Sequence, residues 1–254
     1  MIVYCAAAAC AIGVVLVASR LVKRWRGVDD PDPDGPTTAH AGAMLSALFL
    51  LAFAIAIVVP WTTADAARSN TYAESQAVAE ASWAASRLPP PDARRVQAGL
   101  SGYVALVRGP EWRLMEKGRL SPDGQRRLDD LRRDVIAVKA DNDELKDARN
   151  AVLGHLTEIS AARKQRAMDA RTTPPRGLLA VTVLTGLAVL LLPFLSGARP
   201  RGATLVPLAL MAGLLAAGTY LTIDIAHPFT GALAVRPDAF TGLQGELQRI
   251  AGGG

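Results

Sequence analysis

Closely spaced acidic residues that could bind a metal ion occur in the segment "DDPDPDGP". Asp30, Asp32 and Asp34, followed by Gly35, match the first half of a calcium-binding loop. The position of the bidentate acidic ligand is occupied by Ala41, and prolines stiffen the run. We therefore interpret this segment as a solvated acidic linker, with calcium binding as the alternative.

Few other polar residues have the spacing that catalysis requires. His155 and Glu158 share one helix face, an arrangement typical of a solvated surface pair when no third group accompanies it. The histidines are scattered without metal-ligand spacing, and no nucleophile–base pair or phosphate-binding loop occurs. We therefore expect no catalytic residue, no metal site and no cofactor, and a protein that is not an enzyme.

Two further acidic positions admit a ligand-binding or a structural interpretation. Glu111 and Trp112, in "GPEWRLMEKG", could contact a ligand. We favour the structural interpretation, in which Trp112 packs on neighbouring helices and Glu111 caps a helix start. Glu80 is placed on the apolar side of its helix near Trp83, where we expect it to pair with an arginine across a helical bundle.

The elements that must position these residues are helices, several of them strongly apolar. Half of the 254 residues are hydrophobic, and they gather in runs of roughly the ~20 residues needed to cross a bilayer. The predicted membrane spans cover residues 2–19, 43–61, 178–196 and 203–223. The pattern predicts an all-α integral membrane protein with four transmembrane helices and an extramembrane helical bundle inserted between spans two and three.

This organisation divides the chain into four parts. They are residues 1–62 with the first two spans and their basic and acidic loop, 63–176 with the bundle, 177–225 with the last two spans, and 226–254 as a C-terminal tail. The spans contain no Asp, Glu, Lys, Arg or His, which argues against a proton relay or an ion-coupled pump. The net charge of +5 comes without a basic run interleaved with aromatic residues, which argues against nucleic acid as a partner.

The orientation in the cell membrane follows from the distribution of lysine and arginine. Arg20, Lys23, Arg24 and Arg26 follow span one, and Arg199 and Arg201 lie between spans three and four. Because short basic loops stay in the cytoplasm, we expect residues 63–176 and both termini to be extracytoplasmic. The opposing evidence is a basic run before span three, formed by Arg163, Lys164, Arg166, Arg171 and Arg176.

Helical spacing continues through the extramembrane block. A helix is expected to run on from span two, with Tyr72, Gln76, Ala79 and Trp83 on one stripe. Ser121 is predicted to cap the helix that begins at the following proline. Later helices also carry thin apolar stripes, for which packing against further copies of the chain is the simplest means of burial. We therefore expect a homo-oligomer.

Three stretches of the sequence resemble the signature of one known family. They are "AESQAVAEASWAASRLPP", "GYVALVRGPEWRLMEKGRLSP" and "IDIAHPFTGALAVRPDAF". They are similar to the bacterial bestrophin-like membrane family, a family of unknown function whose name records a suggested kinship with bestrophin anion channels. We interpret the motif residues as structural; they are Glu80, Glu111, Trp112, Gly118, Asp224, Pro228, Phe229 and Gly231.

The last of these stretches follows the fourth span. Asp224 is expected to mark the point where that span leaves the hydrocarbon. Pro228 would end the helix, and Gly231 would permit a turn. The segment is predicted to anchor the last span to the extramembrane block rather than to do chemistry.

The resemblance also implies a function. Bestrophins are pentameric chloride channels with four membrane helices per subunit, the second of which lines a hydrophobic neck. By analogy, Phe49, Phe53 and Ile57 are candidate pore-lining residues, with packing inside the subunit as the alternative. The implied protein is an oligomeric channel for an inorganic anion in a lipid bilayer. The alternative is a non-conducting membrane-anchored sensor or scaffold.

Overall fold

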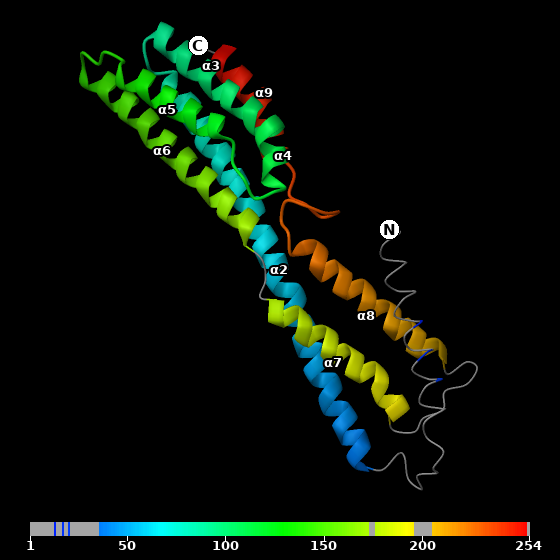
Figure 1. Cartoon of the computed structure of the whole chain (residues 1–254). Helices are drawn as coiled ribbons and strands as arrows, with labels where there is room; N and C mark the ends of the chain where they lie inside the picture. Colours follow the sequence, from blue (N-terminus) through cyan, green and yellow to red (C-terminus); the bar gives the residue numbers. More distant parts are fainter. Residues whose placement is uncertain are drawn as a thin grey trace. The chain divides into compact units, whose positions relative to one another are not determined.

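The structure is a computed structural model that describes residues 36–172, 176–195 and 205–252, together with Gly13, Val17 and Arg20. These residues form helices joined by turns, with no β-strand among them (Figure 1). The all-α expectation is thus confirmed for the described part of the chain. The first predicted span apart from Gly13 and Val17, residues 29–35 of the acidic segment, and the loop containing Arg199 and Arg201 lie outside it.

The chain forms two compact units, and one long helix contributes to both. Unit 1 comprises Met1–Thr62 and Thr173–Ala226, and unit 2 comprises Thr63–Thr172 and His227–Gly254. The helices are α2 (Pro36–Ala85), α3 (Pro90–Leu106), η1 (Val107–Glu111), α4 (Trp112–Met115), α5 (Pro122–Ile136), α6 (Asp143–Arg171), α7 (Arg176–Leu195), α8 (Leu205–Ile225) and α9 (Asp238–Gly252). Helix α2 continues through Pro60, as the sequence predicts.

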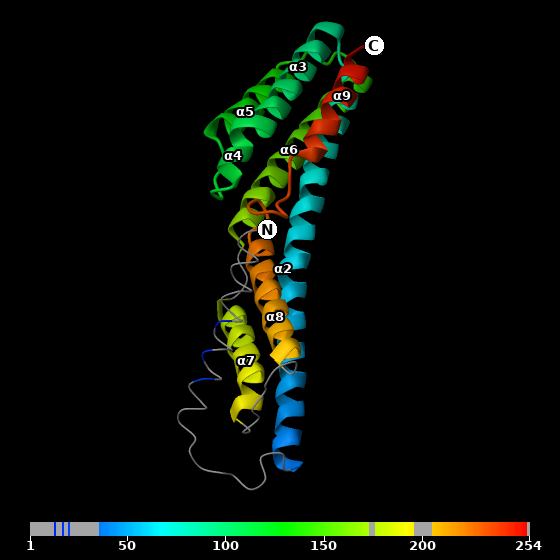
Figure 2. The same cartoon turned by 90° about the vertical axis from the view of Figure 1, so that its right-hand side faces the viewer.

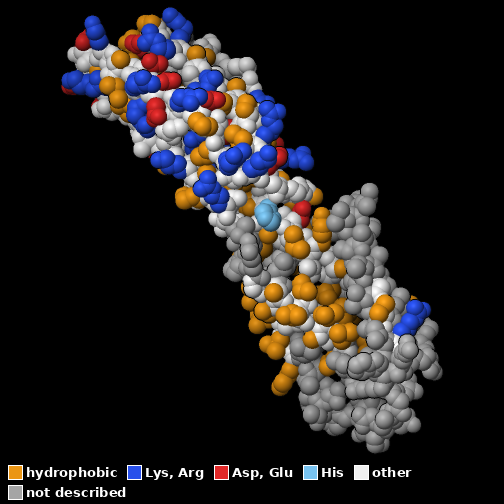
Figure 3. Space-filling view, in the orientation of Figure 1, with side chains coloured by type: hydrophobic (Ala, Val, Ile, Leu, Met, Phe, Trp, Pro, Cys, Tyr) orange, Lys and Arg blue, Asp and Glu red, His pale blue; other side chains and the backbone are white. Residues whose placement is uncertain are grey.

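Unit 1 contains the apolar helices. Large apolar side chains such as Leu50, Leu184 and Leu214 are exposed on α2, α7 and α8, and Figure 3 shows apolar atoms dominating the described surface of this unit. Among the described residues, α2 is the one helix both long and apolar enough to cross a membrane. The apolar segments Ala180–Leu192 and Ala209–Ile225 of α7 and α8 are shorter.

Glycines allow the helices of unit 1 to pack closely. A Cβ atom added to Gly186 of α7 would lie 3.1 Å from Phe49 and 2.8 Å from Leu215. One added to Gly218 of α8 would lie 2.3 Å from the ring of Phe53. The rings of Phe49 and Phe53 also stack on each other, with centroids 5.5 Å apart. These two aromatic side chains of α2 are therefore packed against α7 and α8 of the same chain.

Unit 2 is a helical bundle with one apolar core. The core residues come from the end of α2 and from α3, α5, α6 and α9, and include Val78, Leu100, Leu128, Leu156 and Phe240. The helix starts are capped by side chains: the Ser121 hydroxyl accepts from Asp123 N (3.2 Å), and Asn142 Oδ1 accepts from Leu145 N (2.8 Å). The Ser121 cap is as predicted.

The part of α2 inside unit 2 buries a different face from the stripe that the spacing singled out. Ala79 is buried, but Tyr72 and Trp83 are 55% and 54% exposed, and Gln76 is exposed. The buried face consists mainly of small residues. Thr71, Glu74 and Val78 also lie on this face. An alanine-rich helix has little contrast between its faces, so spacing alone does not identify the face that packs.

The C-terminal residues belong to unit 2 and end in a helix, although the sequence analysis treated 226–254 as a tail. Phe240, Leu243, Leu247 and Ile250 of α9 are buried in the core. The Ser75 hydroxyl of α2 donates to Ala239 O at 3.0 Å, and Figure 2 shows the two helices side by side. Residues 238–252 thus complete the bundle.

Candidate functional site

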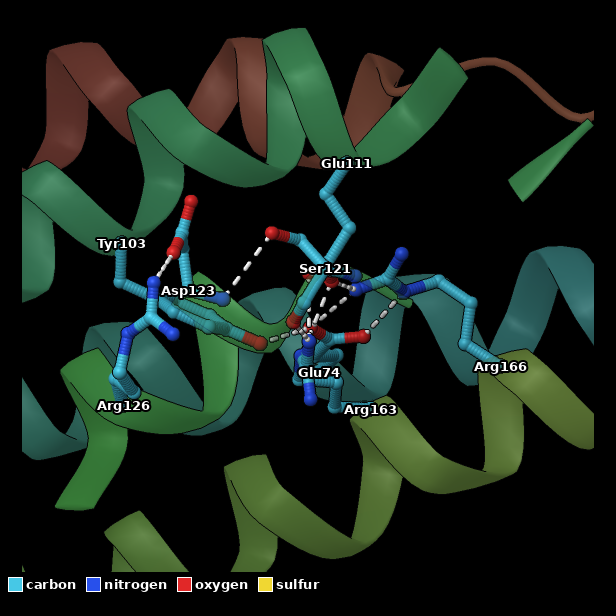
Figure 4. A network of polar contacts seen from close by, with 8 residues as sticks. All are labelled: Glu74, Tyr103, Glu111, Ser121, Asp123, Arg126, Arg163 and Arg166. Atoms are coloured by element: carbon cyan, nitrogen blue, oxygen red, sulfur yellow. Dashed lines mark hydrogen bonds and ion pairs between the residues drawn. The ribbon is translucent and has the colours of Figure 1, made fainter. Parts of the chain in front are cut away.

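A cluster of completely buried charged side chains lies inside unit 2 (Figure 4). Its centre is the pair formed by Glu74 of α2 and Arg166 of α6, both 0% exposed. Arg166 Nε donates to Glu74 Oε2 at 2.7 Å, and Arg166 Nη2 donates to Glu74 Oε1 at 3.1 Å. This two-bond geometry fixes the orientation of both side chains and is the stronger form of an arginine–carboxylate interaction.

A second ion pair adjoins the first. Arg163 donates to Glu111 through Nε (3.0 Å) and Nη2 (2.6 Å), and its Nη2 also donates to Ser121 O at 2.6 Å. Glu111 Oε1 accepts a further bond from Arg166 Nη2 at 2.8 Å, and its Oε2 accepts one from Ser121 N at 3.2 Å. Glu111 therefore links α6, the start of α5 and the first ion pair.

Tyr103 of α3 completes the hydrogen bonding of Glu74. Its buried hydroxyl donates to Glu74 Oε1 at 2.6 Å. Burial, and then the negative charge of Glu74, raise the pKa of Tyr103 well above its ordinary value of 10.0. Tyr103 is consequently neutral and acts as a donor near neutral pH.

Aromatic rings surround the guanidinium of Arg166. Its Cζ lies 5.6 Å from the ring centroid of Trp112 and 6.0 Å from that of Phe240. Nη1 has no hydrogen-bond partner among the described residues, and the two rings add a favourable electrostatic contact to the guanidinium as a whole. Burial lowers the pKa of Arg166, but Glu74, Tyr103 and Glu111 together outweigh this effect and the net pKa is raised, so the charge persists.

A π-helical turn brings Glu111 into the cluster. The turn η1 spans Val107–Glu111 and contains Pro110, which has no N–H to donate. A proline inside a helix removes one hydrogen bond and crowds the preceding turn, which favours a locally wider turn here. Glu111 and Trp112 leave this turn pointing into the bundle, and both are buried.

Gly124, near the start of α5, makes room for the Glu111–Arg163 pair. A Cβ atom at this position would lie 2.5 Å from Arg163 Nη2 and 2.6 Å from Glu111 Oε2. These distances are shorter than any normal contact, so the ion pair needs a glycine here.

A further polar link joins α2 and α6. Asn70 Nδ2 donates to Asp169 Oδ2 at 2.8 Å, and Gln165 Nε2 donates to Asp169 Oδ1 at 2.9 Å. Together with the Glu74–Arg166 pair, this link fixes how α2 and α6 are aligned within unit 2.

The cluster is built for structure rather than catalysis. Its two carboxylates and two guanidiniums balance in charge and bind each other, and all four side chains are at most 3% exposed. No substrate can reach them without unfolding the bundle. Within the described residues, no group of three or more His, Cys, Asp and Glu side chains could hold a metal ion.

The structure corrects the expectation for Glu80. This residue is exposed and forms no ion pair with the residues that the structure describes. The acid that pairs with an arginine across the bundle is Glu74, because Glu74 lies on the buried face of α2 and Glu80 does not. In contrast, the candidate residue Glu111 lies within the cluster, and Trp112 packs against it.

The remaining motif residues lie at turns and in the core. Gly118 has a φ of 62°, which favours glycine, and its carbonyl accepts from Arg171 Nε at 2.9 Å. Gly231 has a φ of 92° in the turn that Val235 N closes on Pro228 O at 2.7 Å. Phe229 is buried and meets Trp112 edge-on at 5.6 Å.

Asp224 is half-buried near the end of α8 in unit 1, and Pro228 follows that end by a few residues.

The candidate pore residues Phe49, Phe53 and Ile57 are all partly buried on α2. His155 Nδ1 lies 2.9 Å from Glu158 Oε2 on the surface of α6.

Sequence reasoning missed Glu74 and the role of the arginines of α6. A signal was present, because the apolar stripe Val152, Leu156 and Ile159 continues at helical spacing into Arg163 and Arg166. Charged residues in line with a buried stripe must be buried with partners. The identity of those partners needs the tertiary structure, since Arg166 is 92 positions from Glu74 along the chain.

Taken together, the fold and the cluster define a helical protein with a membrane-type apolar helix and a bundle held by buried ion pairs. A family model, described as Bestrophin-like domain, matches residues 5–240. The chain therefore belongs to the bestrophin-like family, as its motifs indicated. No curated protein and no solved structure matches the chain.

Proposed function

We propose that the protein is a subunit of an oligomeric membrane channel that conducts an inorganic anion, without enzymatic activity or a cofactor. The observation that carries the proposal is the family match over residues 5–240, because the family takes its name from the bestrophins. The exposed apolar side chains of α2, α7 and α8 support insertion into a bilayer.

The proposed channel has four membrane spans per subunit. In this proposal α7 and α8 supply spans three and four in addition to the span in α2, although their apolar segments Ala180–Leu192 and Ala209–Ile225 are shorter. The first span consists of residues 2–19, of which the structure describes Gly13 and Val17 alone. The basic loops after spans one and three favour extracytoplasmic positions for residues 63–176 and both termini.

Helix α2 gives the proposed channel a route for gating. It is a single helix that carries apolar residues before Thr62 and the buried Glu74 beyond it. A change in the packing of unit 2 would therefore act on the same helix that carries the candidate pore residues Phe49, Phe53 and Ile57.

Chloride flux from liposomes that contain the purified full chain tests conduction. The proposal requires flux above that of protein-free liposomes in preparations where insertion and oligomeric state have been verified. An absence of flux across a range of calcium concentrations and pH values would reject it.

The alternative function is a non-conducting membrane-anchored scaffold or sensor. The observation that favours it is the packing of Phe49 and Phe53 against Gly186 and Gly218 of the same chain, which occupies two candidate pore residues within the subunit. Imaging of the purified oligomer separates the two functions. A ring with α2 around an open axis supports the channel, and a closed assembly without an axial opening supports the scaffold.

Cysteine accessibility tests the proposed orientation. In a Cys5→Ala, Cys10→Ala background, Ser101→Cys places one thiol at an exposed position of α3. Labelling of intact cells by a membrane-impermeant reagent is expected. Protection in intact cells with labelling after lysis would instead place unit 2 in the cytoplasm.

A further inference from the structure

One end of unit 2 is formed by the segments that connect it to unit 1. Residues 63–70 and 164–172 adjoin the unit boundaries at Thr62 and Thr173, and residues 227–237 follow Ala226. Contacts inside unit 2 join these segments to each other and to residues 112–120: Asn70 binds Asp169, Arg171 binds Gly118 O, and Phe229 packs on Trp112. We call these four segments the basic end.

The exposed charges of the basic end are strongly biased in sign. Its exposed acidic residues are Asp65 and Glu116, and Asp169 is buried in hydrogen bonds. The exposed basic residues are Arg68, Arg113, Lys117, Arg119, Lys164, Arg171 and Arg236. None of these basic side chains forms an ion pair with another described residue, so their charge is left for an external partner.

Elsewhere in unit 2, many cations are compensated within their own helix. Five of them pair with an aspartate three positions earlier: Arg95, Arg126, Arg132, Arg133 and Lys146. The excess of positive charge therefore belongs to the basic end and is not a general property of the bundle.

The chain places this end close to the predicted membrane surface. Arg68 follows Thr62 in the same helix, and six helical residues span about 9 Å. A headgroup layer is roughly 5–8 Å thick on each side of the hydrocarbon, so a long arginine side chain reaches it. Met168 and Leu233, which are 55% and 50% exposed, add apolar surface at this end.

We propose that the basic end binds the phosphate groups of anionic lipid headgroups. Phosphate oxygens accept hydrogen bonds from arginine and lysine, and basic residues beside a bilayer gain favourable energy from negatively charged lipids. The interaction attaches unit 2 to the lipid surface. The inference rests on membrane insertion of the proposed channel, but it requires no ion conduction.

Thermal unfolding of the full chain in detergent micelles tests the interaction. Micelles doped with phosphatidylglycerol are compared with micelles doped with equal phosphatidylcholine. The test variant is Arg68→Gln, Lys117→Gln, Arg119→Gln, which spares the Arg171 hydrogen bond. The matched control is Arg95→Gln, Arg126→Gln, Arg133→Gln, which removes the same charge from exposed, internally paired positions.

Phosphatidylglycerol should raise the unfolding temperature of the parent chain and the control more than phosphatidylcholine does. In the test variant, about tenfold or more phosphatidylglycerol should be needed for the same rise, since each cation contributes to binding. Equal responses in test and control variants would overturn the proposal. An equal rise in the unfolding temperature with inorganic phosphate would show that the basic end binds a free anion instead of lipid headgroups. The chloride-flux result decides the channel function separately.

Discussion

Glu74 and Arg166 form a two-bond ion pair between α2 and α6, with Arg166 Nε 2.7 Å from Glu74 Oε2 and both side chains 0% exposed. Such pairs are a weak source of net stability, because the desolvation of two charges offsets their attraction. Losing one partner is very different, since a buried charge then remains without compensation. The pair therefore specifies which faces of α2 and α6 meet.

Glu74→Gln removes the charge while keeping the shape of the side chain. The variant should lose about 3–5 kcal/mol of stability, because two buried arginines then share the single carboxylate of Glu111 and one buried positive charge is left uncompensated. Glu80→Gln is the matched control on the exposed face of the same helix, and its effect should stay within about 0.5 kcal/mol. Thermal unfolding of the full chain in detergent measures both. Equal unfolding temperatures would show that the buried pair does not hold the bundle.

Gly124→Ala tests the close approach to the second ion pair. The new methyl group would lie 2.5 Å from Arg163 Nη2, so we expect a loss of about 1–3 kcal/mol as the pair is pushed apart. Gly154→Ala, at a helical position with nothing within 4 Å, should instead stabilise by about 0.5–1 kcal/mol. The opposite signs of the two effects make the comparison decisive. A stabilising Gly124→Ala would contradict the geometry.

Gly118→Ala tests the turn between α4 and α5. Its φ of 62° costs a residue with a side chain about 1–2 kcal/mol, and the Arg171 bond to its carbonyl depends on this turn. Asparagine tolerates this backbone conformation better, so Gly118→Asn should lose less stability. Unfolding temperatures of the two variants should rank in that order. A neutral Gly118→Ala would mean that the turn rearranges freely.

The raised pKa of Tyr103 should make the free energy of unfolding depend on pH in the alkaline range. Because its pKa in the folded state is raised, its contribution is complete below the unfolded-state pKa of about 10 and is lost as pH rises above that value. The parent chain should lose up to about 1.4 kcal/mol per pH unit from this group. Tyr103→Phe should be less stable near neutral pH and decline less steeply above about pH 10. The exposed Tyr72→Phe serves as the control, and parallel curves for all three chains would refute the prediction.

Trp83 tests the proposed self-association of the chain. This side chain and Tyr72 share an exposed stripe of α2, and large exposed aromatic residues are typical of interfaces. Trp83→Ser should shift the mass distribution of the purified protein in detergent towards smaller assemblies. Ile136→Ser, which removes an equally exposed apolar residue from α5, should leave that distribution unchanged. If both variants keep the parent mass, the stripe is not an interface.

Much of this protein is determined by the local sequence. The apolar runs predict helices, and Ser121 with the proline that follows it predicts where one of them begins. Because such features depend on neighbouring residues alone, the all-α fold and several helix boundaries could be predicted. Three local motifs together identified the family, which the match to residues 5–240 bears out. Helix formation, helix capping and family motifs all depend on residues that lie close together in the chain.

The tertiary structure decided which residues meet. The sequence pointed to Glu80 as the buried acid, but Glu74 is buried, because alanines on both faces of α2 give spacing little power to choose between them. The same ambiguity placed Tyr72 and Trp83 on a stripe that the structure leaves exposed. Arg163 and Arg166 could be seen to need partners, yet Glu111 and Glu74 lie 52 and 92 positions away. Pairing over such separations depends on how helices dock, which no local pattern records.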